Sequence, residues 1–123
     1  MNNLVKLIKY KKAQQIAKDT IQYLSSYIRE GISESDIEYA AREFMCKKGI
    51  QKFWYYNVAA LVLVGKRTTE SVSGKIYKTT KTKVKENDLV TVDLSPEMNL
   101  FWVHLSAGSS WVLCFTRGIN EFF

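Results

Sequence analysis

The chain has 123 residues, of which 46% are hydrophobic and 24% are charged, so it forms one domain at most and has enough apolar side chains for a core. It contains no run of about 18 apolar residues, which argues against a membrane-spanning helix. The net charge of +6 raises the question of nucleic-acid binding, but the lysines are spread over three separate segments. We therefore expect no nucleic-acid partner and no membrane partner.

Two helices are predicted at the start of the chain. Apolar residues recur at steps of three and four positions over residues 4–30, which is typical of a helix with one buried face. A second helix is predicted to begin at Ser33, because its hydroxyl and the Asp36 carboxylate three positions later can cap a helix together. Gly49 is expected to end that helix.

The remainder of the chain predicts strands separated by a polar loop. The expected strands are 53–56, 58–64, 89–94, 100–105 and 111–115, and residues 68–85 are expected to form a loop or loose hairpin. The strands 89–94 and 100–105 are predicted to pair as a hairpin across the break at Ser95 and Pro96. Helices followed by antiparallel strands predict an α+β fold, with two N-terminal helices packed on an antiparallel sheet.

Asp93 and His104 are the candidate site. Asp93 ends the apolar run Leu89–Val92, and a carboxylate at the end of a buried strand is costly unless it is paired or bound to a metal. His104 follows eleven positions later, so the predicted hairpin would place both side chains at neighbouring points of one sheet. The alternative for His104 is a partly buried histidine with one backbone partner.

The two cysteines, Cys46 and Cys114, lie far apart in different kinds of segment. We expect both to be free, largely buried thiols, because a disulfide needs an oxidising compartment. This expectation places the protein in the cytoplasm.

The order of these elements resembles a known family. The segment 31–36 (GISESD) between the helices, the strand that ends at Gly65 and the string ENDLVTVDLSP at 86–96 are similar to the first half of the catalytic domain of the pita-bread metallopeptidases. These are the methionine aminopeptidase, Xaa-Pro aminopeptidase, prolidase and creatinase group, and the chain most resembles the Xaa-Pro aminopeptidase-like members. The resemblance covers about residues 8–103 and implies half of a pita-bread fold.

The resemblance also implies a site with two divalent metal ions held by two Asp, one His and two Glu. Asp93 matches the first ligand, and the position of the second Asp is occupied by His104. The Arg expected three positions later is Ala107, and the substrate-binding histidine expected near residues 72–75 is missing. Intact relatives use Mn, Co or Zn, whereas we expect no tightly bound metal here and assign no catalytic residue.

The resemblance divides the chain into 1–103, the N-terminal half of the catalytic domain, and 104–123, a divergent or frameshifted tail. It implies a truncated Xaa-Pro aminopeptidase-like metallopeptidase, which we expect to be inactive alone. Intact relatives act on peptide substrates. The alternative is a non-catalytic protein- or peptide-binding module, which includes the case of a homodimer. The aromatic residues 53–56 and Trp102 would form its binding surface unless they fill the core.

Overall fold

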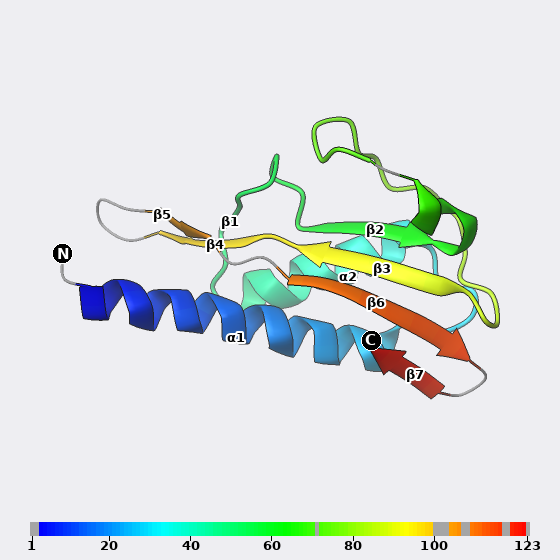
Figure 1. Cartoon of the computed structure of the whole chain (residues 1–123), viewed down its shortest axis with the longest axis horizontal. Coiled ribbons are helices and arrows are strands. Elements are labelled where there is room, and N and C mark those ends of the chain that lie inside the picture. The colour runs from blue at the N-terminus through cyan, green and yellow to red at the C-terminus, as the bar shows by residue number, and fades with distance from the viewer. Residues whose placement is uncertain (1–2, 71, 100–103, 107–108, 117–118, 123) are drawn as a thin grey trace.

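Two helices pack against two small antiparallel sheets, as Figure 1 shows. The computed structural model describes residues 3–70, 72–99, 104–106, 109–116 and 119–122, with side chains up to residue 98. The elements are α1 (Asn3–Tyr27), α2 (Glu34–Lys47), β1 (Lys52–Phe53), β2 (Ala60–Val64), the 3-10 helix η1 (Gly65–Thr69), β3 (Leu89–Leu94), β4 (Pro96–Asn99), β5 (His104–Ser106), β6 (Ser109–Thr116) and β7 (Ile119–Phe122). One sheet has the order β2-β3-β6-β7 and the other β1-β4-β5. The predicted α+β class is confirmed.

The predicted caps of α2 are both present. The Ser33 hydroxyl accepts a hydrogen bond from the Asp36 backbone N–H (3.2 Å), and the Asp36 carboxylate accepts one from the Ser33 backbone N–H (3.1 Å). The bond from the Ser33 backbone is the main reason that the pKa of Asp36 lies below its ordinary value of 3.8. Gly49 follows the helix at a φ of +99°, a left-handed conformation that glycine adopts without strain.

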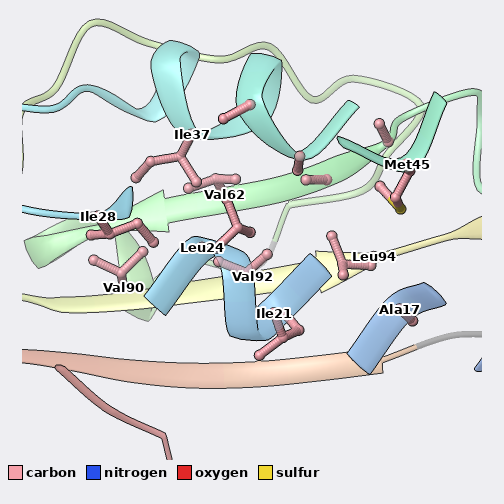
Figure 2. Packing of buried hydrophobic residues seen from close by; sticks show 14 of the residues in the cluster. Ala17, Ile21, Leu24, Ile28, Ile37, Met45, Val62, Val90, Val92 and Leu94 are labelled. Carbon is pink, nitrogen blue, oxygen red and sulfur yellow. The ribbon is translucent and has the colours of Figure 1, made fainter. Parts of the chain in front are cut away.

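The core lies between the helices and one face of the four-stranded sheet. Figure 2 shows Leu24 of α1 and Ile37 of α2 packed near Val62 of β2 and Val92 of β3. Alternate residues of β3 are buried, so Val90, Val92 and Leu94 face the helices. Most of the apolar residues that recur every three or four positions along the helices therefore pack in the core.

The predicted strand pairing is partly wrong. β3 pairs with β2 and β6, whereas β5 pairs with β4, so residues 89–94 and 100–105 do not form a hairpin. The physical reason is that the chain does not turn back at Ser95. Its hydroxyl donates to the Val58 carbonyl oxygen (2.6 Å), its own carbonyl oxygen accepts the Trp54 N–H (3.0 Å), and the chain continues as β4 to pair with β1.

Two other predictions need correction. The predicted strand 53–56 is limited to Lys52–Phe53, because Tyr56 and Asn57 adopt φ angles of 50° and 56° in the turn that follows. Cys46 is exposed and free, not buried, whereas the side chain of Cys114 lies outside those described. Neither helix is long and apolar enough to cross a membrane, within the residues that the structure describes.

Candidate functional site

Asp93 lies on the face of the four-stranded sheet that the helices do not cover. It alternates with the buried Val92 and Leu94, and its side chain is exposed. Its register partners are Leu61 of β2 and Ser110 of β6, neither of which is a titratable residue. The expectation of a buried carboxylate is therefore wrong, because the alternation of the strand turns this side chain outward.

His104 lies in the other sheet. It begins β5 and is paired with Asn99 of β4, so it is not a register neighbour of Asp93. The side chain of His104 and the whole of Ala107 lie outside what the structure describes. The role of Asp93 and His104 as metal ligands remains a prediction.

The described residues do not fit a centre that holds two metal ions. Within the side chains of residues 3–70 and 72–98, no three His, Cys, Asp or Glu side chains gather closely enough to hold a metal ion. Two-metal hydrolysis needs several anionic ligands around ions about 3.5 to 4 Å apart. We therefore assign no chemical step to a metal in this chain.

The carboxylate of Glu34 is fully buried at the start of α2. Its Oε2 accepts hydrogen bonds from the Val64 N–H (3.0 Å) and from Nε of Arg67 (2.8 Å). Its Oε1 accepts from both the N–H (3.2 Å) and the hydroxyl (2.9 Å) of Thr80. One side chain thus joins α2, the end of β2, η1 and the loop that follows, and each of its oxygens has two donors.

Arg67 completes this cluster from η1. Besides its contact with Glu34, it lies 3.3 Å from the exposed Glu70. The hydrogen bond to Glu34 is the main reason that the pKa of Arg67 lies above its ordinary value, although burial opposes the shift. This cluster was not predicted from the sequence, in which the segment around Ser33 indicated a helix cap and part of the family resemblance but no partner for Glu34. The available signal was an acid directly after the capping serine together with an arginine three positions after the end of a buried strand.

Tyr77 covers the outer edge of β2. Its hydroxyl accepts a hydrogen bond from the Val62 N–H (3.0 Å) and donates one to the Val62 carbonyl oxygen (2.8 Å). It belongs to residues 77–84, here called the strap, which run beside the start of α2 and are tied to it by the bond from the Glu34 N–H to the Thr82 carbonyl oxygen (3.0 Å). Burial is the main cause that raises the pKa of Tyr77 from 10.0 to about 12.

Replacing Tyr77 with phenylalanine is expected to lower the free energy of unfolding at about pH 8 by about 1–3 kcal/mol, because two buried backbone groups of Val62 lose their partner. The raised pKa means that the neutral phenol stabilises the fold fully below about pH 10, and that this contribution is lost as the pH rises towards 12. The difference in the free energy of unfolding between Tyr77→Phe and the unchanged chain, measured by urea unfolding, should therefore be smaller at about pH 11 than at about pH 8.

The matched control is Tyr39→Phe, which removes a hydroxyl from a side chain that is 62% exposed. Its free energy of unfolding at about pH 8 should lie within about 0.5 kcal/mol of that of the unchanged chain. A difference for Tyr77→Phe that stays constant with pH would show that the hydroxyl does not titrate in the folded protein as described.

The aromatic residues 53–56 are divided between core and surface. Phe53 is buried at 6% exposure, whereas Trp54 and Tyr56 are 46% and 59% exposed. The turn after Tyr56 contributes Asn57 and Val58 to a groove of about 300 Å³, which Glu38, Arg42 and residues 77–79 of the strap also line. Arg42 is held in this groove by Glu38 (2.9 Å) and by the Asn57 carbonyl oxygen (3.2 Å). Trp102 lies outside the described residues.

Comparisons with known proteins agree with this architecture. Residues 8–105 match Metallopeptidase family M24. A search of curated proteins finds no match. Among solved structures, the chain is similar to an X-Pro aminopeptidase from Thermotoga maritima MSB8, with a TM-score of 0.71 and 18% identity over 92% of this chain and 29% of that one.

Two further solved structures are similar. For an Xaa-Pro dipeptidase from Bacillus anthracis the TM-score is 0.61 and the identity 23%, over 89% of this chain and 27% of that one. For the dipeptidase PepE from Mycobacterium ulcerans the TM-score is 0.62 and the identity is 14%, over 85% of this chain and 25% of that one. The chain thus spans 25% to 29% of the length of the three structures, and the likeness shows the fold.

Proposed function

The chain belongs to Metallopeptidase family M24, and from this premise we propose that it corresponds to the N-terminal half of an Xaa-Pro aminopeptidase-like catalytic domain that does not hydrolyse peptides by itself. The family assignment agrees with the resemblance drawn from the sequence, and the fold matches part of the pita-bread fold. Relatives in this family use divalent metals. The activity and the substrate class are proposals, because the chain spans less than a third of the similar structures.

The surroundings of Asp93 are the observation that supports inactivity. Its register partners are Leu61 and Ser110, and the position that the resemblance assigns to a second acid is His104. A single carboxylate cannot hold two metal ions about 3.5 to 4 Å apart. In a complete domain, the residue matching Asp93 would supply one of several metal ligands, and the others would come from elsewhere in that domain.

The test is incubation of the purified chain with Xaa-Pro peptides and Mn, Co or Zn. We expect no release of the N-terminal residue above the rate without protein, as measured by mass spectrometry. The control variant is Asp93→Asn, which removes the charge of the one matched ligand. Metal-dependent turnover that Asp93→Asn abolishes would refute the proposal, because it would show a working site that includes Asp93.

Peptide binding without catalysis is the second candidate, and the exposure of Trp54 and Tyr56 favours it. Tryptophan and tyrosine contribute more than most residues to the energy of protein interfaces. The same incubations distinguish the candidates when tryptophan fluorescence is followed alongside product release. A fluorescence change that saturates with peptide, disappears in Trp54→Phe and occurs without product supports the binding module.

A further inference from the structure

A basic groove lies where β2 ends and β3 begins. It has a volume of about 390 Å³ and is lined by Lys66 and Arg67 on one side and by Lys83 and Lys85 on the other. The only acidic side chain in its lining is Asp88. Four cationic side chains and one carboxylate therefore surround a space that is large enough for a small ligand.

The fold brings these cations together from two segments that are distant in the sequence. β2 and β3 are antiparallel with Val64 opposite Val90, so the end of one strand lies beside the beginning of the other, as Figure 1 shows. Gly65 makes the turn from β2 into η1 at a φ of +61°. The strap is held in place by the bond from the Gly31 N–H to the Val84 carbonyl oxygen (2.9 Å). The sequence showed these lysines as separate groups, and the tertiary structure joins them.

The lysines of this groove have no ion-pair partner within the described residues, whereas Arg67 has one and Asp88 accepts a backbone hydrogen bond. Lys66, Lys83 and Lys85 are exposed and form no salt bridge within that part of the chain. Arg67 is held by Glu34 at 2.8 Å. The Asp88 carboxylate accepts a hydrogen bond from the Lys85 backbone N–H (2.8 Å) and lies beside Gly65, so it offsets part of the positive charge of the groove.

Like charges around one concave space raise its electrostatic potential and favour an anion there. Ammonium groups on flexible stems bind phosphate oxygens as point charges and can adjust to several of them. A single carboxylate ligand would neutralise one cation and leave the others facing one another. A ligand that carries linked phosphates matches both the number of lysines and the confined volume of the groove. A single-stranded nucleic acid would instead follow a long positively charged stripe.

We propose that this groove is a binding site for a compact polyphosphate group, that is, a ligand with two or more linked phosphates contacted by Lys66, Lys83 and Lys85. The site lies apart from Asp93 and does not depend on the proposed function. Arg67 acts by positioning η1 through Glu34, and the lysines make the contacts with the anion.

Titration calorimetry of the whole chain with inorganic tripolyphosphate tests the proposal. Binding is expected at about 20 mM salt and should weaken strongly at about 200 mM, where charges are screened over shorter distances. Lys66→Gln/Lys85→Gln should raise the Kd at least about tenfold, because two charged contacts to phosphate oxygens are lost. Both side chains are exposed, so this variant is expected to fold.

The matched control is Lys11→Gln/Lys12→Gln, which removes the same charge from two exposed positions of α1. Its Kd for tripolyphosphate should stay within about twofold of the unchanged chain. Absence of tripolyphosphate binding at low salt, or an equal loss in both double variants, would overturn the proposal. So would an oligonucleotide that binds more tightly than tripolyphosphate at equal phosphate concentration, because it would indicate an extended basic surface.

Discussion

Glu34→Gln is expected to lower the free energy of unfolding by about 3–5 kcal/mol, the range measured when one partner of a buried ion pair is removed. The carboxylate is fully buried, and each of its oxygens accepts two hydrogen bonds. A carboxamide has one oxygen, so its NH₂ group would face either the donors of Val64 and Arg67 or those of Thr80. Urea unfolding followed by circular dichroism measures the change.

Glu70→Gln is the matched control for Glu34→Gln. Glu70 pairs with the same guanidinium of Arg67, but its side chain is 51% exposed. Exposed ion pairs contribute about 0–1 kcal/mol to stability, so the free energy of unfolding of this variant should be close to that of the unchanged chain. Equal losses in the two variants would show that the burial of Glu34 does not set the energy of the cluster.

Leu24→Ala is expected to lower the free energy of unfolding by about 2–5 kcal/mol, because it leaves a cavity in a close-packed core. Leu24 has no exposed surface and points from α1 towards the sheet, as Figure 2 shows. Thermal and urea unfolding of the purified variant measure the loss. A value below about 1 kcal/mol would contradict the packing of α1 described here.

The control for Leu24→Ala lies in the same helix. Leu4 is 63% exposed near the start of α1, so Leu4→Ala makes the same chemical change and the same change in helix propensity without a cavity. It should shift the free energy of unfolding by about 0.5 kcal/mol or less. The difference between the two variants isolates the contribution of burial.

The two helices and the strands β2, β3 and β6 were predictable because their signals are local, whereas β4 and β7 were not predicted. The apolar spacing located α1, and the pair Ser33 and Asp36 located the start of α2, since both depend only on residues within a few positions. The pairing of β3 was not predictable in this way. It depends on Ser95 being held by Val58 and Trp54, which are about 40 positions earlier in the chain.

The candidate site shows the same limit. The local apolar run placed Asp93 at the end of a strand, and the structure confirms the strand. The same run suggested burial, whereas the alternation of the strand turns the side chain outward. Glu34, Arg67 and Thr80 form a connected polar cluster, and no local pattern joins them because they are up to 46 positions apart. The basic groove depends in the same way on the approach of two distant segments.

The outer strand β2 is closed by side chains and has no neighbouring strand on that side within the described sheet. Tyr77 occupies the backbone groups of Val62, and Glu34 occupies the N–H of Val64. If the strap lifts, the N–H and carbonyl groups of Val62 become a template on which an extended segment of another molecule can pair. Protection of this edge of β2 against such pairing therefore depends on a loop. Substitutions there should reduce solubility before they change the packing of the core.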